Sequence, residues 1–225
     1  MANDQEKEAA ARASLRFIKD GQVVGLGTGS TAAHFIQLLG EQVKQGLHVR
    51  GIPTSVRSEE LAESLGIPLT TLDECQEIAV TVDGADEVDP QLRLIKGGGG
   101  ALLREKIVAS ATKQLVIVAD ASKQVKMLGK FPLPVEVIRF SQALVSKRIT
   151  ALGANVQLRV ENSGKPFVTD ENNHILDCHF GEIRDPEALA RQLSDMPGVV
   201  EHGLFIGMAS VALLARGSEI IELKR

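Results

Sequence analysis

The chain has 225 residues, of which 44% are hydrophobic and only 3% aromatic, with 21 glycines and neither Trp nor Tyr. A folded chain of this length buries about 70–75% of its extended surface, so a sizeable core needs no disulfide or metal, and collagen, low-complexity disorder and disulfide miniproteins are excluded. The net charge is -4, no long basic run occurs and aromatic stacking platforms are scarce, which argues against binding of nucleic acid.

Apolar strands alternate with amphipathic helices along the first 120 residues. The first helix is expected to begin at a cap on Asn3 or Asp4 and to end at Gly21. A glycine turn then opens a helix within 27–46, and helical spacing predicts two more helices at 55–66 and 101–113. Strands are predicted at 22–27, 47–53, 77–84, 91–96 and 114–120. This alternation predicts a Rossmann-like, mostly parallel sheet with helices on both faces.

The pattern changes near residue 130, where two prolines follow Gly129 closely. The elements expected beyond it are, in order, strand, helix, strand, hairpin strands, helix and strand, at 135–140, 141–153, 155–160, 165–180, 186–196 and 198–201. This is the split βαβ order of a smaller ferredoxin-like α+β domain. Apolar strands in 203–224 are expected to return to the first sheet. We therefore predict a catalytic domain formed by 1–129 and 203–225 and a small domain formed by 130–202.

The first motif, GLGTGST at 25–31, lies between a strand and a helix. Its glycines let the backbone approach a ligand, and its hydroxyls lie beside the free N–H groups of a helix start, as in a phosphate cradle. A tight turn that merely needs glycine is an equally good explanation. A dinucleotide fingerprint is disfavoured, because Ser30 stands where glycine is required and the next strand ends without an acidic residue.

The second motif, DGADE at 83–87, follows a strand, so Asp83 and Asp86 can face the crevice at the carboxyl ends of the sheet. These carboxylates could transfer protons or recognise hydroxyls. A solvated acidic turn is the commoner structure for such a sequence. A magnesium site built from Asp83, Asp86, Glu87 and Asp89 is a third interpretation, although the spacing matches no dedicated metal loop.

The third motif runs from Lys96 through four glycines to Glu105. Four successive glycines raise the entropy lost on folding, so they suggest a backbone that a ligand approaches closely. A carboxylate and an ammonium at one anion site can support enolisation, which needs a base and a positive group for the oxyanion. Taken singly, Glu105 could instead pair with Arg104 or Lys106 on the helix surface. Lys123, just past another strand end, could bind a phosphate or be a loop lysine.

The cysteines, the N-terminal segment and the lengths of the apolar runs indicate in which cellular compartment the protein acts. Cys75 and Cys178 are far apart in sequence and fit neither a disulfide framework nor a paired-thiol zinc site. The acidic start does not resemble a signal peptide, and no apolar run approaches the roughly 20 residues of a membrane span. The five histidines have no ligand spacing. We expect a cytoplasmic protein without membrane contact.

Together these segments resemble ribose-5-phosphate isomerase of the A type. The resemblance is carried in order by GLGTGSTA, TSVRSEELAESLGIPL, TVDGADEVD, LIKGGGGALLREKI and VIVADASKQVKMLGKFPLPVEV, and more weakly by ILDCHFGEI and MPGVVEHGLF. It implies interconversion of ribose 5-phosphate and ribulose 5-phosphate in the non-oxidative pentose phosphate pathway, without metal or organic cofactor. It also implies a homodimer, or else a tetramer.

The resemblance also implies roles for single residues. Glu105 is the general base that moves a proton between C2 and C1 through an enediolate, Asp83 assists ring opening, and Asp86 with Lys96 orients hydroxyls and stabilises the oxyanion. The pKa of Glu105 should then be raised toward ~6 by burial. The implied substrate-binding residues are Thr28, Gly29, Ser30, Thr31, Asp83, Gly84, Ala85, Asp86, Lys96, Gly97, Gly98, Gly99 and Lys123. Lys7 falls where some members carry a phosphate-contacting lysine, in a helix too generic to decide.

Two other functions use a similar architecture. A sugar-phosphate sensor would keep the phosphate cradle, but it would not need Glu105, Asp83 and Lys96 together and would usually carry a DNA-binding segment. A coenzyme A transferase would need a glutamate nucleophile in a different context and a longer chain. The isomerase therefore explains the motifs best.

Overall fold

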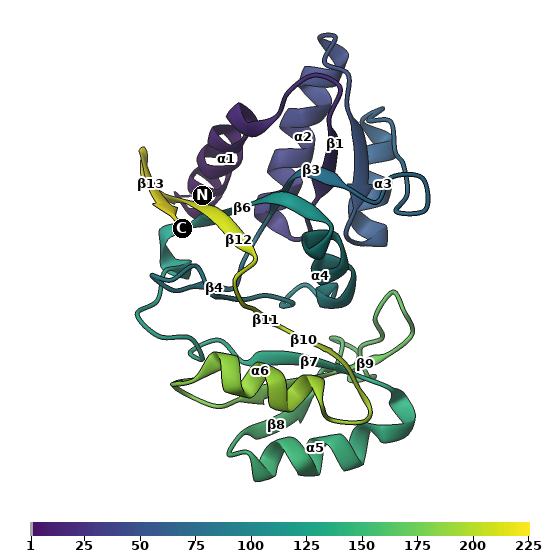
Figure 1. Ribbon diagram of the computed structural model, residues 1–225, viewed down its shortest axis with the longest axis vertical. Helices are drawn as coiled ribbons and strands as arrows, with labels where there is room; N and C mark the ends of the chain where they lie inside the picture. Colours follow the sequence, from purple (N-terminus) through teal and green to yellow (C-terminus); the bar gives the residue numbers. More distant parts are fainter. Residues whose placement is uncertain (1) are drawn as a thin grey trace.

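The computed structural model describes residues 2–225. Its largest sheet has six strands in the order β13-β12-β6-β3-β1-β2 (Figure 1). Neighbouring strands run parallel except β12 and β13, which form an antiparallel hairpin at one edge. The strands are β1 (Val23–Leu26), β2 (Arg50–Pro53), β3 (Ile78–Asp83), β6 (Thr112–Asp120), β12 (Ala209–Arg216) and β13 (Glu219–Lys224). The predicted mostly parallel sheet is confirmed.

Helices cover both faces of this sheet, as expected. On one face α1 (Ala2–Ser14), α2 (Ser30–Lys44) and α3 (Val56–Ser64) share a core with alternate strand residues such as Val24, Val82 and Val116. On the other face α4 (Leu102–Ser110) shares core clusters with Val23 and Leu115, whose side chains point opposite to those of Val24 and Val116 because strand residues alternate between faces. Complete burial of strands such as Val23–Leu26 explains why they are apolar without interruption.

A second, three-stranded sheet lies over that other face, in the order β11-β5-β4. It is formed by β4 (Glu87–Val88), β5 (Leu94–Ile95) and β11 (Leu204–Phe205). The strands predicted in residues 203–224 therefore belong to two sheets. As predicted, β12 and β13 lie in the six-stranded sheet, whereas β11 pairs with β5 in the three-stranded sheet. This small sheet carries Lys96 directly after β5 and so sets its position.

The third sheet has four antiparallel strands in the order β10-β7-β9-β8. Its elements in chain order are β7 (Leu133–Val137), α5 (Gln142–Ala151), β8 (Asn155–Leu158), β9 (His174–His179), α6 (Pro186–Ser194) and β10 (Val199–His202). Numbered within this layer the strand order is 4-1-3-2, so the ferredoxin-like arrangement is confirmed. Its core joins the apolar face of the sheet to α5 and α6 through Val145, Ile149 and Leu193.

Two local predictions are wrong. The first helix is not capped at Asn3 or Asp4, since α1 begins at Ala2, and it ends at Ser14 rather than at Gly21. The hydroxyl of Ser14 donates to the carbonyl of Ala11, and a short 3-10 turn over Leu15–Phe17 leads into extended backbone at Ile18. The first arm of the hairpin expected at 165–180 forms only an isolated bridge between Val160 and Pro166.

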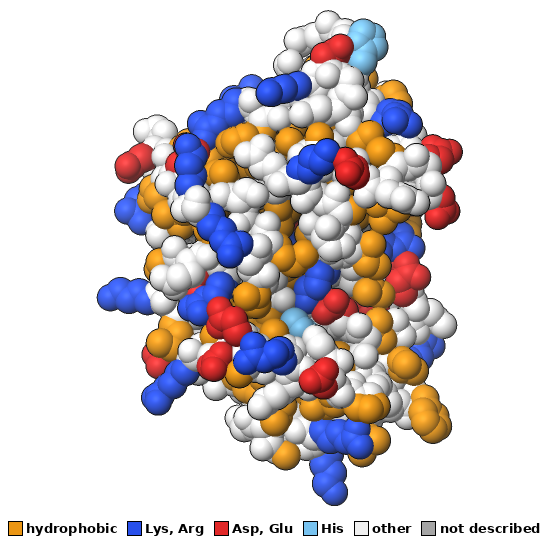
Figure 2. Space-filling view, in the orientation of Figure 1, with side chains coloured by type: hydrophobic (Ala, Val, Ile, Leu, Met, Phe, Trp, Pro, Cys, Tyr) orange, Lys and Arg blue, Asp and Glu red, His pale blue; other side chains and the backbone are white. Residues whose placement is uncertain are grey.

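The six-stranded and three-stranded sheets with their helices form the large layer, and the four-stranded sheet with α5 and α6 forms the small layer. Charged side chains gather where these two layers meet. Figure 2 shows acidic and basic side chains next to each other at this level of the molecule. Ion pairs across the junction include Arg93 with Glu187 and Lys106 with Glu201. Within residues 2–225, no helix is long and apolar enough to cross a membrane.

Candidate active site

The candidate site residues meet at the carboxyl ends of the parallel strands β1, β3 and β6. These strands are neighbours in the sheet, so the loops after Leu26, Asp83 and Asp120 come together at one edge. The loop after β5 and the start of α4 close the space to form a cavity of about 190 Å³. Its lining residues are Lys7, Thr28, Gly29, Ser30, Thr31, Gly84, Ala85, Asp86, Lys96, Gly97, Gly98, Gly99, Glu105, Ala119, Asp120, Ser122 and Lys123.

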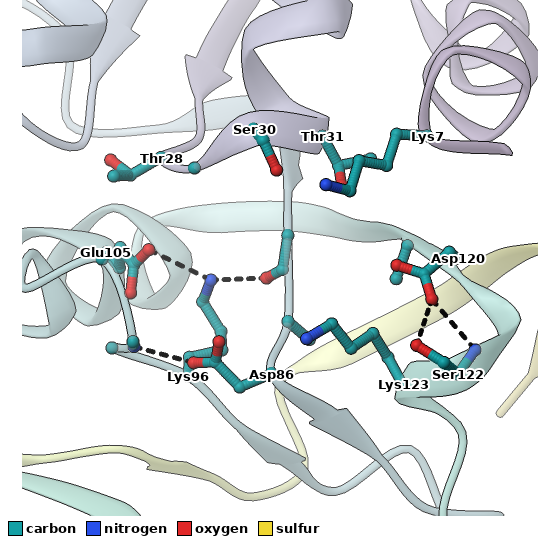
Figure 3. Close-up of a pocket in the computed structure, with 17 residues that line it drawn as sticks. Lys7, Thr28, Ser30, Thr31, Asp86, Lys96, Glu105, Asp120, Ser122 and Lys123 are labelled. Carbon is teal, nitrogen blue, oxygen red and sulfur yellow. Dashed lines mark hydrogen bonds and ion pairs between the residues drawn. The ribbon is translucent and has the colours of Figure 1, made fainter. Parts of the chain in front are cut away.

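Lys96 and Glu105 lie together at one end of the cavity (Figure 3), and Asp83, which does not line the cavity itself, contacts Lys96. The ammonium of Lys96 is 2.9 Å from a carboxylate oxygen of Asp83 and 3.3 Å from Oε1 of Glu105, and it donates to the carbonyl of Gly84 at 2.6 Å. Exposure is 2% for Lys96, 1% for Asp83 and 4% for Glu105. The third motif therefore forms one charge cluster with the second, and Glu105 does not pair with its helix neighbours.

Glu105 has one oxygen bound and one free. Oε1 contacts Lys96, whereas Oε2 is buried and has no hydrogen-bond partner among residues 2–225. Burial raises the pKa of Glu105 to about 8, against the opposing effect of the Lys96 charge. The shift has the direction expected from the sequence and exceeds the value of ~6 expected there. A carboxylate with a free oxygen and a raised pKa is suited to accept a proton.

Lys96 stays charged despite its burial. Desolvation would lower its pKa, but the neighbouring carboxylates of Asp83 and Glu105 more than offset this, so the pKa lies above that of a free lysine. The ammonium also lies 5.4 Å from the ring centre of Phe205, which favours a cation further. A permanent positive charge at this end of the cavity can stabilise a developing oxyanion.

Asp83 does not line the cavity itself but contacts Thr28 and Lys96, which do. Its Oδ1 accepts the backbone N–H of Thr28 at 2.9 Å and that of Gly84 at 2.7 Å, while its Oδ2 faces Lys96. A Cβ on Gly27 would lie 2.3 Å from Asp83 Oδ1, so only glycine allows β1 and β3 to approach this closely. Asp83 therefore connects the first motif to Lys96.

Asp86 is held by the glycine loop. Its Oδ2 accepts the N–H of Gly98 at 2.7 Å (Figure 3), and a Cβ on Gly98 would lie 2.5 Å from its other oxygen. Burial raises the pKa of Asp86, while the Gly98 hydrogen bond and the charges of Lys96, Lys123 and Arg159 act in the opposite direction. The absence of a side chain at Gly98 is thus required for this contact.

The hydroxyl of Thr28, predicted from the sequence, contacts other hydroxyls that the sequence analysis did not assign. Its Oγ1 contacts Thr54 Oγ1 at 2.7 Å and donates to Ser55 Oγ at 2.8 Å, and Ser58 Oγ donates to the carbonyl of Gly27 at 2.7 Å. These residues follow β2 or begin α3, where Ser55 caps the helix by accepting the N–H of Ser58. Only the position of Thr54 and Ser55 at a strand end could have pointed to them.

The far end of the cavity is positive. Lys7 from α1 and Lys123 from the turn after β6 line it together with Ser30 and Thr31 at the start of α2 (Figure 3). Gly29 precedes that helix with a φ of 102°, a conformation that favours glycine, and leaves the first N–H groups of α2 facing this end. Lys7, undecided from the sequence, lies in the cavity.

Asp120, which the sequence did not assign, also lines the cavity, where it accepts the N–H and hydroxyl of Ser122. This contact holds the turn that carries Lys123, so Asp120 shapes the positive end without neutralising Lys123 directly.

The remaining acidic residues of the second motif are used elsewhere, so the magnesium interpretation is wrong for the described chain. Glu87 accepts the backbone N–H groups of Gly129 and Phe131, and Asp89 pairs with Arg93. Among residues 2–225 no three His, Cys, Asp or Glu side chains are grouped so as to hold a metal ion.

Sequence comparisons give a consistent result. A family model described as ribose 5-phosphate isomerase A (phosphoriboisomerase A) matches residues 50–219. The ribose-5-phosphate isomerase A of Parvibaculum lavamentivorans is 54% identical, with 98% of this chain and 99% of the relative covered. That of Agrobacterium fabrum is 52% identical, with 94% of each chain covered.

Solved structures agree with the sequence relatives. A ribose 5-phosphate isomerase A from Methanocaldococcus jannaschii superposes with a TM-score of 0.94 at 40% identity over 99% of both chains. A D-ribose-5-phosphate isomerase in complex with phospho-erythronic acid superposes with a TM-score of 0.97 at 40% identity over 100% of both chains.

Proposed function

The chain belongs to the ribose 5-phosphate isomerase A family, and from this premise we propose that the cavity at the end of β1, β3 and β6 is its active site. The chain interconverts D-ribose 5-phosphate and D-ribulose 5-phosphate. One observation carries the assignment of the site: Glu105 has a buried, unpartnered oxygen beside the ammonium of Lys96.

The two ends of the cavity suit the two ends of the substrate. The positive end, with Lys7, Lys123 and the first N–H groups of α2, binds the phosphate. The substrate hydroxyls then lie against Thr28, Asp86 and the N–H groups of the glycine loop, and C1 and C2 lie near Glu105. The small, polar lining supports a phosphorylated polyol rather than a large apolar ligand.

The proton transfer follows from this placement. Oε2 of Glu105 removes the C2 proton of open-chain ribose 5-phosphate, the C–H electrons form the C1–C2 double bond, and the carbonyl electrons move to the C1 oxygen. Lys96 stabilises the resulting enediolate. The O2 proton passes to O1, and Glu105 returns its proton to C1, so that C2 becomes the ketone and no atom is gained or lost.

Asp83 and Asp86 have supporting roles in this proposal. Asp83 orients Lys96 and the Thr28 amide and assists opening of the furanose ring, as the family resemblance implies. Asp86 accepts from a substrate hydroxyl while Gly98 fixes its position. The remaining assigned residues, Gly29, Ser30, Thr31, Gly84, Ala85, Gly97 and Gly99, shape the cavity wall and supply backbone donors.

The test is isomerase activity of the purified chain on ribose 5-phosphate in the presence of EDTA. Ketose formation that persists in EDTA is expected, because proton transfer by Glu105 and charge stabilisation by Lys96 require no metal. Absence of ketose contradicts the activity, and loss of ketose only in EDTA contradicts the metal-free mechanism. Phospho-erythronic acid, whose carboxylate resembles the charge of an enediolate, should inhibit competitively.

Three further properties belong to the same proposal. The domains are 1–129 with 203–225, and 130–202, and the separate six-stranded and ferredoxin-like sheets support this division.

The chain forms a homodimer, for which the 99% exposed side chain of Phe140 offers an apolar contact. It acts in the cytoplasm, in the non-oxidative pentose phosphate pathway, and its two free thiols suit a reducing compartment. Sedimentation of the purified chain and cell fractionation test the last two.

A further inference from the structure

Arg159 reaches from the small layer to the glycine loop of the site. It follows β8, and its side chain is 14% exposed. The guanidinium forms a two-point contact with Asp177 of β9, with Nε donating to Oδ2 at 2.9 Å and Nη2 donating to Oδ1. Its remaining nitrogen, Nη1, donates to the carbonyls of Gly97 at 2.9 Å and Gly98 at 3.2 Å. Asp177 therefore fixes the guanidinium, which in turn holds two successive peptide units.

The opposite ends of these two peptide units face the active site. In a trans peptide the carbonyl and the following N–H point in opposite directions. With the carbonyl of Gly97 turned to Arg159, the N–H of Gly98 points to Asp86, where it donates at 2.7 Å. With the carbonyl of Gly98 turned to Arg159, the N–H of Gly99 faces away from it, and among residues 2–225 this N–H has no acceptor. A free donor in the cavity wall is available to a substrate oxygen.

A second contact from the same layer supports the loop. The ring of Phe167 packs so closely on Gly100 that a Cβ there would lie 2.4 Å from it, and the Arg159 guanidinium lies 5.9 Å from the ring centre. Four glycines in succession have many accessible conformations, so the loop needs external contacts to adopt one. Arg159 and Phe167 supply these contacts from outside the cavity.

We propose that Arg159, held by Asp177, is a positioning residue for the isomerase reaction: its forked guanidinium orients the Gly97–Gly98 and Gly98–Gly99 peptides so that their N–H groups face Asp86 and the substrate. The proposal rests on the active site assigned above. It gives the ferredoxin-like layer a part in catalysis, because that layer provides both members of the ion pair. Arg159 acts through the loop and does not need to touch the substrate.

The test compares Arg159→Met, Arg159→Lys and Asp177→Asn with the wild type. Arg159→Met keeps much of the side-chain volume and removes all five donors, and we expect kcat to fall about 10–100-fold with KM changed less, since misplaced groups near the reacting centre have effects of this size. Lysine keeps the charge but cannot hold Asp177 and both carbonyls together, so Arg159→Lys should lose at least about 5-fold in kcat.

Two measurements separate positioning from a general loss of structure. Inhibition by inorganic phosphate reports the far, positive end of the cavity, and its Ki should stay within about 2-fold in every variant. The double variant Arg159→Met with Asp177→Asn should be no slower than Arg159→Met alone, because the two residues act as one unit. Circular dichroism identifies variants that remain folded at the assay temperature.

The matched control is Glu171→Gln, which removes another ion pair between the small layer and α4, the contact of Glu171 with Arg104 at 2.6 Å, without touching the glycine loop. It should keep wild-type kcat. A folded Arg159→Met with wild-type kcat overturns the proposal, as does an equal loss in the control. If Arg159→Met does not fold, wild-type kcat in Arg159→Lys overturns it. Wild-type activity in the same assay, together with loss in Asp86→Asn, separates failure of this proposal from failure of the site assignment.

Discussion

In the proposed mechanism Glu105 is the base and Lys96 is the cation that stabilises the oxyanion. Both are nearly inaccessible to solvent, and burial disfavours the charged form of each, while the opposite charge of its neighbour favours that form. Burial raises the pKa of the carboxyl toward neutrality, whereas two carboxylates keep the ammonium charged. Under the proposed roles, the proton acceptor and the charge for the oxyanion are already in place before substrate binds.

The pH dependence of kcat/KM tests the state of Glu105. Only the deprotonated carboxylate can accept the C2 proton, and burial raises the pKa of Glu105 to about 8. We therefore expect kcat/KM to rise with pH through the neutral range and to level off above about pH 8. Rates measured between pH 5 and pH 9 on ribose 5-phosphate give the profile. A profile already flat from pH 5.5 upward would contradict a raised pKa.

Replacement of Lys96 tests the oxyanion contact. Lys96→Met removes the only cation in contact with both Asp83 and Glu105 among the described residues, and we expect kcat to fall about 10²–10³-fold. The midpoint of thermal unfolding should also fall, because removal of one partner leaves buried carboxylates unpaired. Lys113→Met is the control, since Lys113 is 68% exposed and pairs with the exposed Glu77. Equal activity of the two variants would exclude this role for Lys96.

At the scale of elements, the site depends on glycines where strands end. Gly27 lets β1 approach β3, Gly29 begins α2 at a positive φ, and Gly98 leaves room for Asp86. Each position has a different physical requirement, which explains why the glycines occur together in the motifs. The glycine loop is further held from the small layer by Arg159.

Gly98→Ala is predicted to disrupt one element contact without affecting the fold. The backbone of Gly98 does not have a positive φ, so alanine fits its conformation, but the new Cβ would lie 2.5 Å from Asp86 Oδ1. Asp86 must then move, and kcat should fall at least about 10-fold, which steady-state kinetics would detect. Lys44→Ala, at an exposed position outside the cavity lining, is the control. Unchanged kcat in Gly98→Ala would mean that Asp86 does not need this position.

The sequence predicted those parts of the site that follow buried strands. Glycines and charges directly after apolar runs pointed to Asp83, Lys96 and Glu105 as candidates, and the regular alternation of elements predicted the large sheet. Arg159 was missed because one arginine after a short strand carries no local signal, and its role depends on a contact 62 residues away. Ser55 likewise resembles an ordinary helix cap.

The failed hairpin prediction has a structural cause. In residues 166–171, Pro166 cannot donate to a neighbouring strand. Phe167 packs on Gly100 instead, and Asp170 accepts the N–H of Val56 at 3.0 Å. The segment therefore contacts the large layer rather than extending the four-stranded sheet, which no periodicity in its own sequence could reveal.

At the scale of the whole molecule, the two layers interlock through buried polar contacts. Glu87 on β4 is 2% exposed and accepts the N–H groups of Gly129 and Phe131, directly before β7. The segment before β7, which joins the two layers, is thus bound to the three-stranded sheet of the large layer. Glu87 does not line the cavity, so we expect this contact to affect stability rather than the reaction.

Glu87→Ala should therefore destabilise the molecule with little effect on kcat. The buried N–H of Gly129 and the partly buried N–H of Phe131 lose their acceptor, which costs about 1–3 kcal/mol each, so the free energy of unfolding should fall by about 2–6 kcal/mol. Urea denaturation followed by circular dichroism measures the change. Glu182→Ala, at an exposed position, should have almost no effect. A stability of Glu87→Ala equal to that of the wild type would show that water replaces these contacts.

The turnover of Glu105→Gln tests the central claim most directly. Glutamine keeps the size of the side chain but cannot accept the C2 proton, so kcat for ribose 5-phosphate should fall by about 10²–10⁴-fold while KM and the circular dichroism spectrum stay close to those of the wild type. The exposed Glu63→Gln is the matched control and should turn over normally. A folded Glu105→Gln enzyme with near wild-type kcat would contradict the assignment of Glu105 as the base.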